Sequence, residues 1–358
     1  MTSEATYRHK RNGAHSAMVY PAGRLPPSPN SVLDRTALEN ALHDACIFLK
    51  SRHIDAFYKA LHEANYPSLQ EFAASNRCRR PTITYRKGGR KPIETVIPPK
   101  LLKFVSKPAN GFVTLTSKVL SVRKNSSGKS AKMSIQLHDG EIVEVVVMRF
   151  ETDYHGFASV SVASQVGCTV GCSFCPEATN EKMNRCLYTC EILEQVIHAS
   201  RFVEYEGSLL KERGDRDKVR NVTFMGSGEP LLNYDHVVAC CKSLADVNTW
   251  DLQRGRITIP TIGVTPRIYQ LARDLPEVVL SVGIHASNQE MRSRRIPIAR
   301  KYPLGNLILA TEFFVRSRMR IVNNDGHRLV NDRRKSREMG TRHATIEYIM
   351  GESWSPPF

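Results

Sequence analysis

Apolar residues recur along this chain with two different periods, and the change of period separates its parts. Between residues 31 and 75 the spacing is three to five positions, which is typical of helices. The first helical series is Leu33, Leu38, Leu42, Cys46 and Leu49. From about residue 111 to 150 the period becomes two, and the turn sequences NSSG and DG separate the runs. This alternation predicts a small antiparallel sheet.

Beyond Ser159, short apolar strands alternate with helical stretches such as CEILEQVIHASRFVEY and YDHVVACCKSLADV. The predicted strands are SVSVASQVG, NVTFMGSG, RITIPTIGV, EVVLSVGIH and HATIEYIM. Alternation of this kind predicts an α/β core with a parallel sheet, either open or closed into a barrel. In both arrangements the chemistry is expected at the carboxyl ends of the strands.

The charge of the chain indicates a polyanionic partner. Lysine and arginine number 51 against 35 aspartates and glutamates, so the net charge is +16. A surplus of this size is most often associated with nucleic acid. The basic residues are clustered, which argues against a merely solvated basic surface. The clusters cover residues 77–92, 121–132 and 316–342.

The sequence predicts neither a membrane span nor an N-terminal secretory signal. No apolar run reaches the length of a membrane span, and the first thirty residues have no apolar segment typical of a signal peptide. They are basic, with Glu4 as the only acid before Asp34, which leaves an organellar transit peptide open. Their Pro, Gly and Asn content favours a disordered tail. We therefore expect a cytoplasmic protein without a membrane partner, with an organelle as the alternative.

Together, pattern and charge predict five parts. They are a disordered basic tail at 1–30, a helical basic RNA-contact domain at 31–105, a small β module at 106–155, an incomplete barrel core at 156–350 and a divergent tail at 351–358. The proline-rich stretch ETVIPPKLL marks the joint after the helical part.

Three of the nine cysteines crowd into the stretch CTVGCSFC. Cys168, Cys172 and Cys175 have the spacing C-x3-C-x2-C. A disulfide framework does not suit an odd cluster in a chain without a secretory signal. A structural zinc site needs four ligands, and no fourth Cys or His has the usual spacing. Thiols without a role and thiolates on an iron–sulfur cluster remain. Only the cluster explains the number three, since three thiolates on a [4Fe–4S] cube leave one iron open.

This spacing, with Phe174 just before the last cysteine, resembles the signature of the radical S-adenosylmethionine (SAM) superfamily. The resemblance implies that SAM chelates the open iron and is cleaved reductively to a 5′-deoxyadenosyl radical. A second motif, GSGEP at residues 226–230, ends the second predicted strand. Its glycines allow a ligand to approach the backbone closely, and Glu229 can meet the SAM ammonium.

A narrower resemblance extends over about residues 140–350. Its blocks are SQVGCTVGCSFC, FMGSGEPLLNYDHV, RITIPTIGVTPRIYQLA, LSVGIHASNQEMRSRRIPIARKYPL and ATIEYIM. Together they resemble the radical SAM adenine methyltransferases, which methylate carbon 2 or carbon 8 of an adenine in ribosomal RNA, and in some cases act on transfer RNA. The resemblance implies a partial (β/α)6 TIM-like barrel with about five strands present. It also implies a [4Fe–4S] cluster, SAM, an rRNA or tRNA substrate with methylation at carbon 2, and a monomer reduced by a flavodoxin- or ferredoxin-type donor.

The resemblance assigns roles by position. The metal ligands are Cys168, Cys172 and Cys175, and the cofactor-binding residues are Phe174, Gly228, Glu229, Gly283, Ile284 and His285. Glu144, in GEIVEVVVM, takes the place of a catalytic proton acceptor. Two of these residues have plainer alternatives, because Glu144 can be an exposed strand glutamate and His285 a packed strand-end histidine.

The chain departs from the family at positions that its mechanism uses. In the family a cysteine near the C-terminus accepts a methyl group, and a second cysteine resolves the protein–RNA adduct. The resolving position is Ser161 here, and a serine cannot form the disulfide that releases the product. Pro260 and Gly283 each replace a serine. We expect the residues Cys186, Cys190, Cys240 and Cys241, in predicted helices, to be core residues rather than substitutes.

After ATIEYIM the chain reads GESWSPPF, without the family's sixth strand or terminal cysteine. We therefore expect a truncated, divergent member whose fifth strand is an exposed edge. Three functions stay open: an RNA-methylating radical SAM enzyme, a radical SAM enzyme with different chemistry, and a non-catalytic, cluster-bearing RNA-binding protein.

Overall fold

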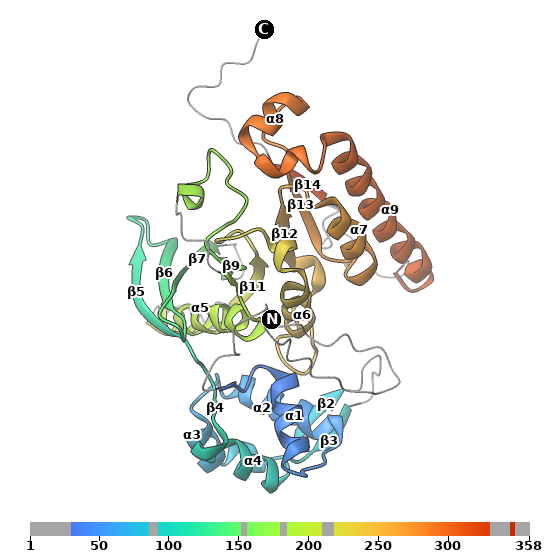
Figure 1. Cartoon of the computed structure of the whole chain (residues 1–358). Coiled ribbons are helices and arrows are strands. Elements are labelled where there is room, and N and C mark those ends of the chain that lie inside the picture. Colours follow the sequence, from blue (N-terminus) through green and yellow to red (C-terminus); the bar gives the residue numbers. More distant parts are fainter. Residues whose placement is uncertain are drawn as a thin grey trace, which may run out of the picture.

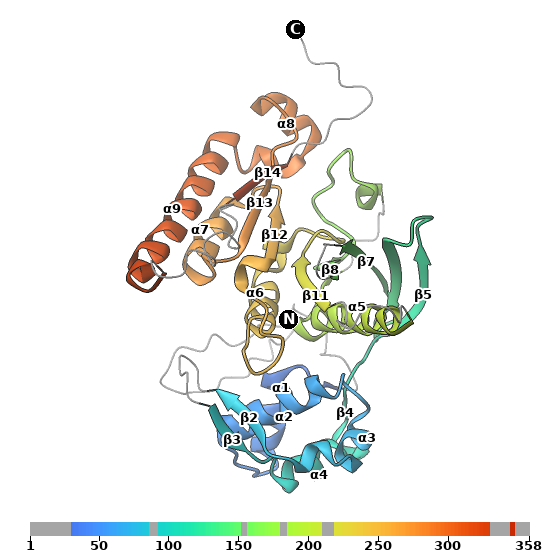
Figure 2. The same cartoon turned by 180° about the vertical axis from the view of Figure 1, so that it is seen from behind.

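The centre of the molecule is an eight-stranded sheet in the order β14-β13-β12-β11-β8-β7-β6-β5, shown in Figures 1 and 2. The computed structural model describes residues 30–85, 92–151, 156–179, 185–209, 218–329 and 344–347. The predicted tails, apart from Asn30, lie outside these residues. So do residues 86–91 of the first basic cluster and 330–342 of the third.

One part of the sheet is parallel. Its strands are β8 (Gly156–Ser161), β11 (Lys218–Thr223), β12 (Ile257–Thr261), β13 (Val279–Gly283) and β14 (Ala344–Glu347). The helices between and after them are α5 (Thr189–Leu209), α6 (Tyr234–Leu244), α7 (Thr265–Asp274), α8 (Gln289–Arg295) and α9 (Leu304–Leu329). This confirms the predicted α/β fold with five parallel strands, and β14 is the edge of the sheet.

The other part of the sheet is antiparallel and continues from the first. It consists of β5 (Lys118–Lys124), β6 (Ser130–Gln136) and β7 (Ile142–Glu151). β7 pairs antiparallel with β8, with Val147 opposite Val160 and Val146 opposite Ser161. The strands that the period-two pattern predicted as a small sheet therefore extend the parallel core, because β7 completes the ladder of β8.

The two faces of the sheet differ in chemistry. One face is apolar and buried, with Val145, Val160, Val222, Ile259 and Leu280 among its side chains. The helix α5 contacts β7, β8 and β11. The opposite face carries small polar side chains, since Ser161 lies opposite Thr223 and Thr223 opposite Thr258. A core sheet with one polar face leaves that face available for ligands.

The N-terminal part forms a separate lobe below the sheet in Figures 1 and 2. Its elements are β1 (Asn30–Ser31), α1 (Arg35–Asp44), α2 (Ser51–Glu63), α3 (Leu69–Ala74), β2 (Thr82–Tyr85), β3 (Pro92–Thr95), α4 (Pro99–Val105) and β4 (Phe112–Val113). The β2–β3 hairpin was not predicted. Within the described residues, no helix is both long and apolar enough to cross a bilayer.

The first predicted helical series ends earlier than its spacing indicated. Cys46 has a left-handed backbone with φ of 56° and is exposed. The N–H of Ile47 donates to the carbonyl of Leu42 at 2.8 Å, and that of Cys46 to His43 at 2.9 Å. These bonds close the end of α1 in the manner of a Schellman turn, so the helical assignment at Cys46 was wrong.

Candidate active site

The three cysteines lie on the loop that follows β8, at the carboxyl end of the parallel strands. Gly167 and Gly171 have φ of 72° and 70°, which lets the loop turn sharply. The N–H of Cys175 donates to the carbonyl of Cys172 at 3.0 Å, so the last two cysteines share one tight turn. The N–H of Ser173 donates to the carbonyl of Arg295 at 2.9 Å, which fastens the loop to α8.

The thiols lie together in apolar surroundings. Cys172 is buried and Cys168 and Cys175 are half-buried, in a small cluster with Val170 and Ile296. Burial, and then the nearness of the other two thiols, raises the pKa of Cys172 to about 12. Burial likewise raises the pKa of Cys168. Burial therefore disfavours the thiolate forms of Cys168 and Cys172 in the protein alone, and a bound metal would favour them.

This donor set fits an iron–sulfur cluster better than a single ion. No three Cys, His, Asp or Glu side chains of the described residues converge on a point that one metal ion could occupy. In a cube each thiolate binds a different iron, so the three sulfurs need not converge. Three cysteines on one loop in apolar surroundings would supply three thiolates to such a cluster and leave one of its irons open.

The GSGEP loop after β11 packs directly on the stem of the cysteine loop. A Cβ added at Gly226 would lie 2.6 Å from the backbone nitrogen of Ala163. The N–H of Gly226 donates to the carbonyl of Val162 at 2.9 Å, and the N–H of Ser164 donates to that of Ser227 at 2.9 Å. Gly228 has φ of 102°. Glycine is thus required where two strand-end loops touch.

Glu229 is buried between two strand-end loops. One carboxylate oxygen accepts from the N–H of Leu231 at 3.0 Å, and the other accepts from the N–H of Ile262 at 2.9 Å. Its own N–H donates to Oε1 of Gln165 at 2.9 Å. Burial raises the pKa of Glu229 to about 7, so a nearby cation would favour its ionised form.

The loop after β13 brings His285 to the cysteine loop. The His285 ring contacts Phe174 edge to face, with centroids 4.9 Å apart. His285 has φ of 54° and is almost fully buried, and burial lowers its pKa. A Cβ at Gly283 would lie 2.4 Å from Nε2 of His285, so the ring occupies the space that a serine side chain would need. Ile284 packs on the main core, and its N–H donates to the carbonyl of Glu347.

Glu144 lies on β7, apart from these loops. Its carboxylate forms an ion pair with Lys132 at 2.5 Å, and both side chains are about half exposed. Side chains two positions apart on a strand lie on the same face of the sheet, so Glu144 shares a face with Val146. Val146 pairs with Ser161, and Glu144 therefore lies on the polar face that carries Ser161. Ser161 is buried beside Thr223, whose hydroxyl has no partner among the described residues.

The other departures are placed as follows. Pro260 pairs with Ser281 of β13, beyond the point where β11 stops pairing with β12. Cys186 lies on the short strand β10 (Arg185–Cys186), not in a helix, because β10 pairs with β9 (Gln165–Val166) on the loop stem. The helical assignment of Cys186 was therefore wrong, and it is half exposed. The cysteines that are buried in helices, as expected, are Cys190, Cys240 and Cys241.

Buried amides hold the site together, and sequence reasoning missed them. Gln195 donates to the carbonyl of Ala163 and accepts from its N–H. Asn233 donates to the carbonyls of Ser164 and Leu187 at 2.7 and 2.8 Å. The one available signal was a polar residue at an otherwise apolar helix position, as for Gln195 in α5.

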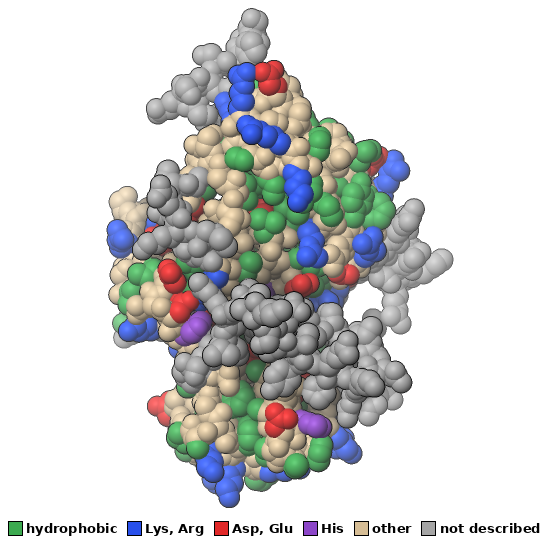
Figure 3. All heavy atoms as spheres, viewed as in Figure 1, with side chains coloured by type: hydrophobic (Ala, Val, Ile, Leu, Met, Phe, Trp, Pro, Cys, Tyr) green, Lys and Arg blue, Asp and Glu red, His purple; other side chains and the backbone are tan. Residues whose placement is uncertain are grey.

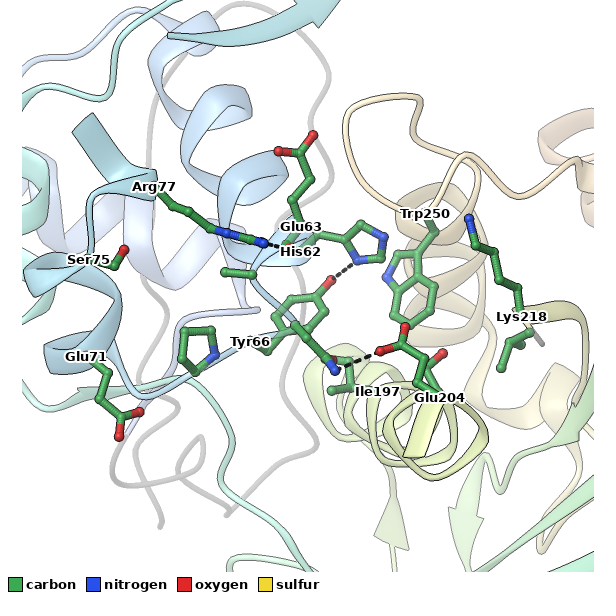
Figure 4. Close-up of a pocket in the computed structure, with 15 residues that line it drawn as sticks. His62, Glu63, Tyr66, Glu71, Ser75, Arg77, Ile197, Glu204, Lys218 and Trp250 are labelled. Atoms are coloured by element: carbon green, nitrogen blue, oxygen red, sulfur yellow. Dashed lines mark hydrogen bonds between the residues drawn. The ribbon is translucent and has the colours of Figure 1, made fainter. Parts of the chain in front are cut away.

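A cavity of about 940 Å³ lies between the N-terminal lobe and the core. Figure 4 shows His62 and Tyr66 facing one another beside Trp250, with Lys218 and Arg77 at its sides. The Tyr66 and Trp250 rings are stacked at 6.3 Å. Lys218 begins β11, so this cavity lies at the opposite end of the strand from the GSGEP loop. No cysteine lines it.

Comparison with known proteins gives one family. Residues 162–333 match the radical SAM superfamily. A probable dual-specificity RNA methyltransferase RlmN from Dictyoglomus thermophilum is 39% identical over 196 residues, 54% of this chain and 51% of that protein. The dual-specificity RNA methyltransferase RlmN of Psychrobacter arcticus is 34% identical over 235 residues, 64% of this chain and 52% of that protein. The chain thus spans about half the length of these relatives.

A solved structure has the same fold. It is a radical SAM methyltransferase from Sphaerobacter thermophilus, with a TM-score of 0.64 and 21% identity. The match covers 90% of this chain and 96% of that chain. At this identity the likeness shows the fold alone.

Proposed function

The chain belongs to the radical SAM superfamily, and from this premise we propose that it is an RNA adenine methyltransferase acting on carbon 2 of an adenine in ribosomal or transfer RNA. The observation that carries the proposal is the meeting of three strand-end loops. The cysteine loop follows β8, the GSGEP loop follows β11, and His285 follows β13 and contacts Phe174.

The residues of this chain hold two cofactors in the proposal. Cys168, Cys172 and Cys175 bind a [4Fe–4S] cluster, which when bound supplies the electron for reductive cleavage of SAM. Phe174 and His285 form the apolar side of the SAM pocket. Glu229, whose carboxylate is fixed by two backbone N–H groups, receives the SAM ammonium together with the carbonyls of the glycine loop. Residues 283–285, at the end of β13 and just after it, also line this pocket in the proposal.

Glu144 is the proton acceptor in this proposal. It lies on the polar face that carries Ser161, and its carboxylate forms an ion pair with Lys132. If Glu144 is instead a surface glutamate without a catalytic role, its replacement should not reduce methylation. The two readings are therefore separated by the Glu144→Gln variant.

RNA is the proposed partner, and the β5–β6 hairpin is a surface for it. The hairpin exposes Lys118, Arg123 and Lys129, which suit phosphate contacts. Near it, Phe150 is 44% exposed and stacks on Phe157 at 5.1 Å, a platform for a base. Figure 3 shows further Lys and Arg side chains over the part that carries α8 and α9. The helical lobe at 31–105 and the β module at 106–155 are then the RNA-contact parts of the chain.

The proposal includes a reductant, an oligomeric state and a compartment. In the proposal a flavodoxin- or ferredoxin-type donor supplies the electron, the chain is a monomer, and the compartment is the cytoplasm, with an organelle as the alternative. The radical SAM core covers residues 156–350 in this division of the chain.

The test is anaerobic reconstitution of the full chain with iron, sulfide, SAM and total RNA, followed by measurement of 5′-deoxyadenosine and methyladenine. Both products are expected, and both are expected to disappear with Cys172→Ala but not with Cys46→Ala, which changes an exposed cysteine remote from the loop. Formation of 5′-deoxyadenosine without methyladenine would instead indicate different radical chemistry. RNA binding with neither product would indicate a non-catalytic binder.

A further inference from the structure

Arg292, on α8, is the largest fully buried side chain in the described residues, with no exposed surface. Its Nη1 donates to the carbonyl of Tyr302 at 3.3 Å, and its Nη2 donates to the carbonyl of Ile262. Its Nε–H has no acceptor among the described residues. The guanidinium is thus held in place by backbone carbonyls while one donor is left open.

The surroundings are built to admit this side chain. Gly263, in the loop after β12, has φ of 110°, and a Cβ there would lie 3.2 Å from Nη2 of Arg292. The same helix carries Arg295, whose carbonyl accepts from the N–H of Ser173 in the cysteine loop. One short helix therefore positions both the cysteine loop and the buried arginine.

A buried charge is costly unless an opposite charge is close. None of the ion pairs formed by the described residues includes Arg292. The ionisable group whose charge acts on its pKa is the Cys172 thiol. The Ile262 carbonyl that accepts from Nη2 belongs to a residue that packs on the apolar cluster around Cys172. The fold therefore retains a buried guanidinium next to the apolar cluster that contains Cys172.

We propose that Arg292 is a positioning residue for the iron–sulfur cluster, and that its fixed positive charge compensates the anionic thiolate-bound cluster and raises its reduction potential. The inference assumes the iron–sulfur cluster of the proposed function, but it does not depend on the proposed reaction or on the RNA substrate. Three thiolates bring negative charge into an apolar site, and reduction adds one more electron. A cation at close range favours the reduced form because Coulomb interactions are weakly screened in a buried site.

The test compares variants of the full chain after anaerobic reconstitution with iron and sulfide. Arg292→Gln removes the charge, Arg292→Lys keeps it, and Arg294→Gln is the matched control. Arg294 lies on the same helix, is 74% exposed and pairs with Glu290. Its replacement by Gln changes the net charge by the same amount but removes no buried charge. The readouts are iron and sulfide content and the midpoint potential, from dithionite titration with mediators followed by visible absorbance.

We expect Arg292→Gln to lower the equilibrium constant for reduction by about tenfold or more, which is about 59 mV for a one-electron couple. Arg292→Lys should restore most of the shift, and Arg294→Gln should leave the potential unchanged. A cluster of unaltered potential and content in Arg292→Gln overturns the inference. If the wild-type chain binds no cluster, the proposed function has failed, which is a different result.

A second measurement covers the case in which a variant folds poorly. The melting temperature is compared with and without the cluster for wild type and Arg292→Met, which is apolar. We expect the cluster to stabilise wild type more than Arg292→Met, since only wild type has a buried charge to compensate. Equal stabilisation, or an Arg292→Met chain that fails to fold even without the cluster, means that the carbonyls alone explain Arg292, and the inference is wrong.

Discussion

The contact between the GSGEP loop and the cysteine-loop stem can be tested with one methyl group. In Gly226→Ala the new Cβ would lie 2.6 Å from the nitrogen of Ala163 and 2.6 Å from the carbonyl carbon of Val162. Both are backbone atoms, so no flexible side chain can move aside. The backbone of Gly226 has no positive φ, and the effect is therefore one of space alone.

The cost follows from how far the loops must separate. Ordinary contact begins at 3.4 Å, so the chains must move apart by about 0.8 Å. The bond from Gly226 N–H to Val162, now 2.9 Å, would exceed hydrogen-bond range, and the two bonds to the carbonyl of Ser227 would weaken. Each lost bond costs about 1 kcal/mol, and overpacking costs about 1–3 kcal/mol. We expect a loss of about 3–5 kcal/mol in the free energy of unfolding.

The assay is urea unfolding of the apo chain followed by far-ultraviolet circular dichroism, with cluster content after reconstitution as a second readout. Two matched glycines serve as controls. Gly305→Ala, at the start of α9, meets nothing within 4 Å and should stay within about 0.5 kcal/mol of wild type. Gly128→Ala also meets nothing but has φ of 68°, so it should cost about 1–2 kcal/mol through backbone strain. A Gly226→Ala chain that unfolds like wild type and binds a full cluster refutes the reasoning.

Three further variants test other parts of the structure. Burial opposes ionisation of Glu191, but its hydrogen bonds with Arg185 lower its pKa below the unfolded value of about 4.3. The ion pair therefore stabilises the fold fully above the unfolded pKa. This stability is lost as the pH falls through the lower pKa of the folded state. Glu191→Gln should therefore flatten the acid side of a stability–pH curve, and an unchanged slope contradicts this. Trp250→Ala removes a ring stacked on Tyr66 and should cost about 2–3 kcal/mol in thermal unfolding, since the ring is only partly buried. Glu144→Gln breaks a half-exposed ion pair worth about 0–1 kcal/mol, so stability and cluster content should not change while methyladenine is lost. Full methylation by this variant would assign Glu144 to the surface.

Several features of the site could be predicted from the sequence because each depends on a short stretch of chain. The spacing of Cys168, Cys172 and Cys175 on one loop is a local property, and three ligands on one loop are near one another in any fold. The alternation of apolar strands and helices predicted five parallel strands, since side-chain period reports local burial. Loop positions at the carboxyl ends of the strands followed from that topology.

Other features depend on contacts between distant residues. Cys186 was assigned to a helix because its spacing from Cys190 is helical, but pairing with Gln165 draws it into β10. The loss of a hydroxyl at Gly283 was visible in the sequence, whereas its reason, the ring of His285 in the same space, was not. Glu229 was expected to face a ligand, and only the structure shows that backbone N–H groups already hold its two oxygens.

The sequence by itself determined the chemistry available to this protein: three thiols at cluster spacing, a glycine–glutamate loop and a basic surface. The tertiary structure alone decided how these are used together. It joined β7 to β8 in one sheet, brought Phe174 against His285 and buried Arg292 against Ile262, which packs on the cysteine cluster. The physical reason is that spacing along the chain constrains only neighbours. Burial and the charge around a buried group arise from segments that meet only when the sheet is complete.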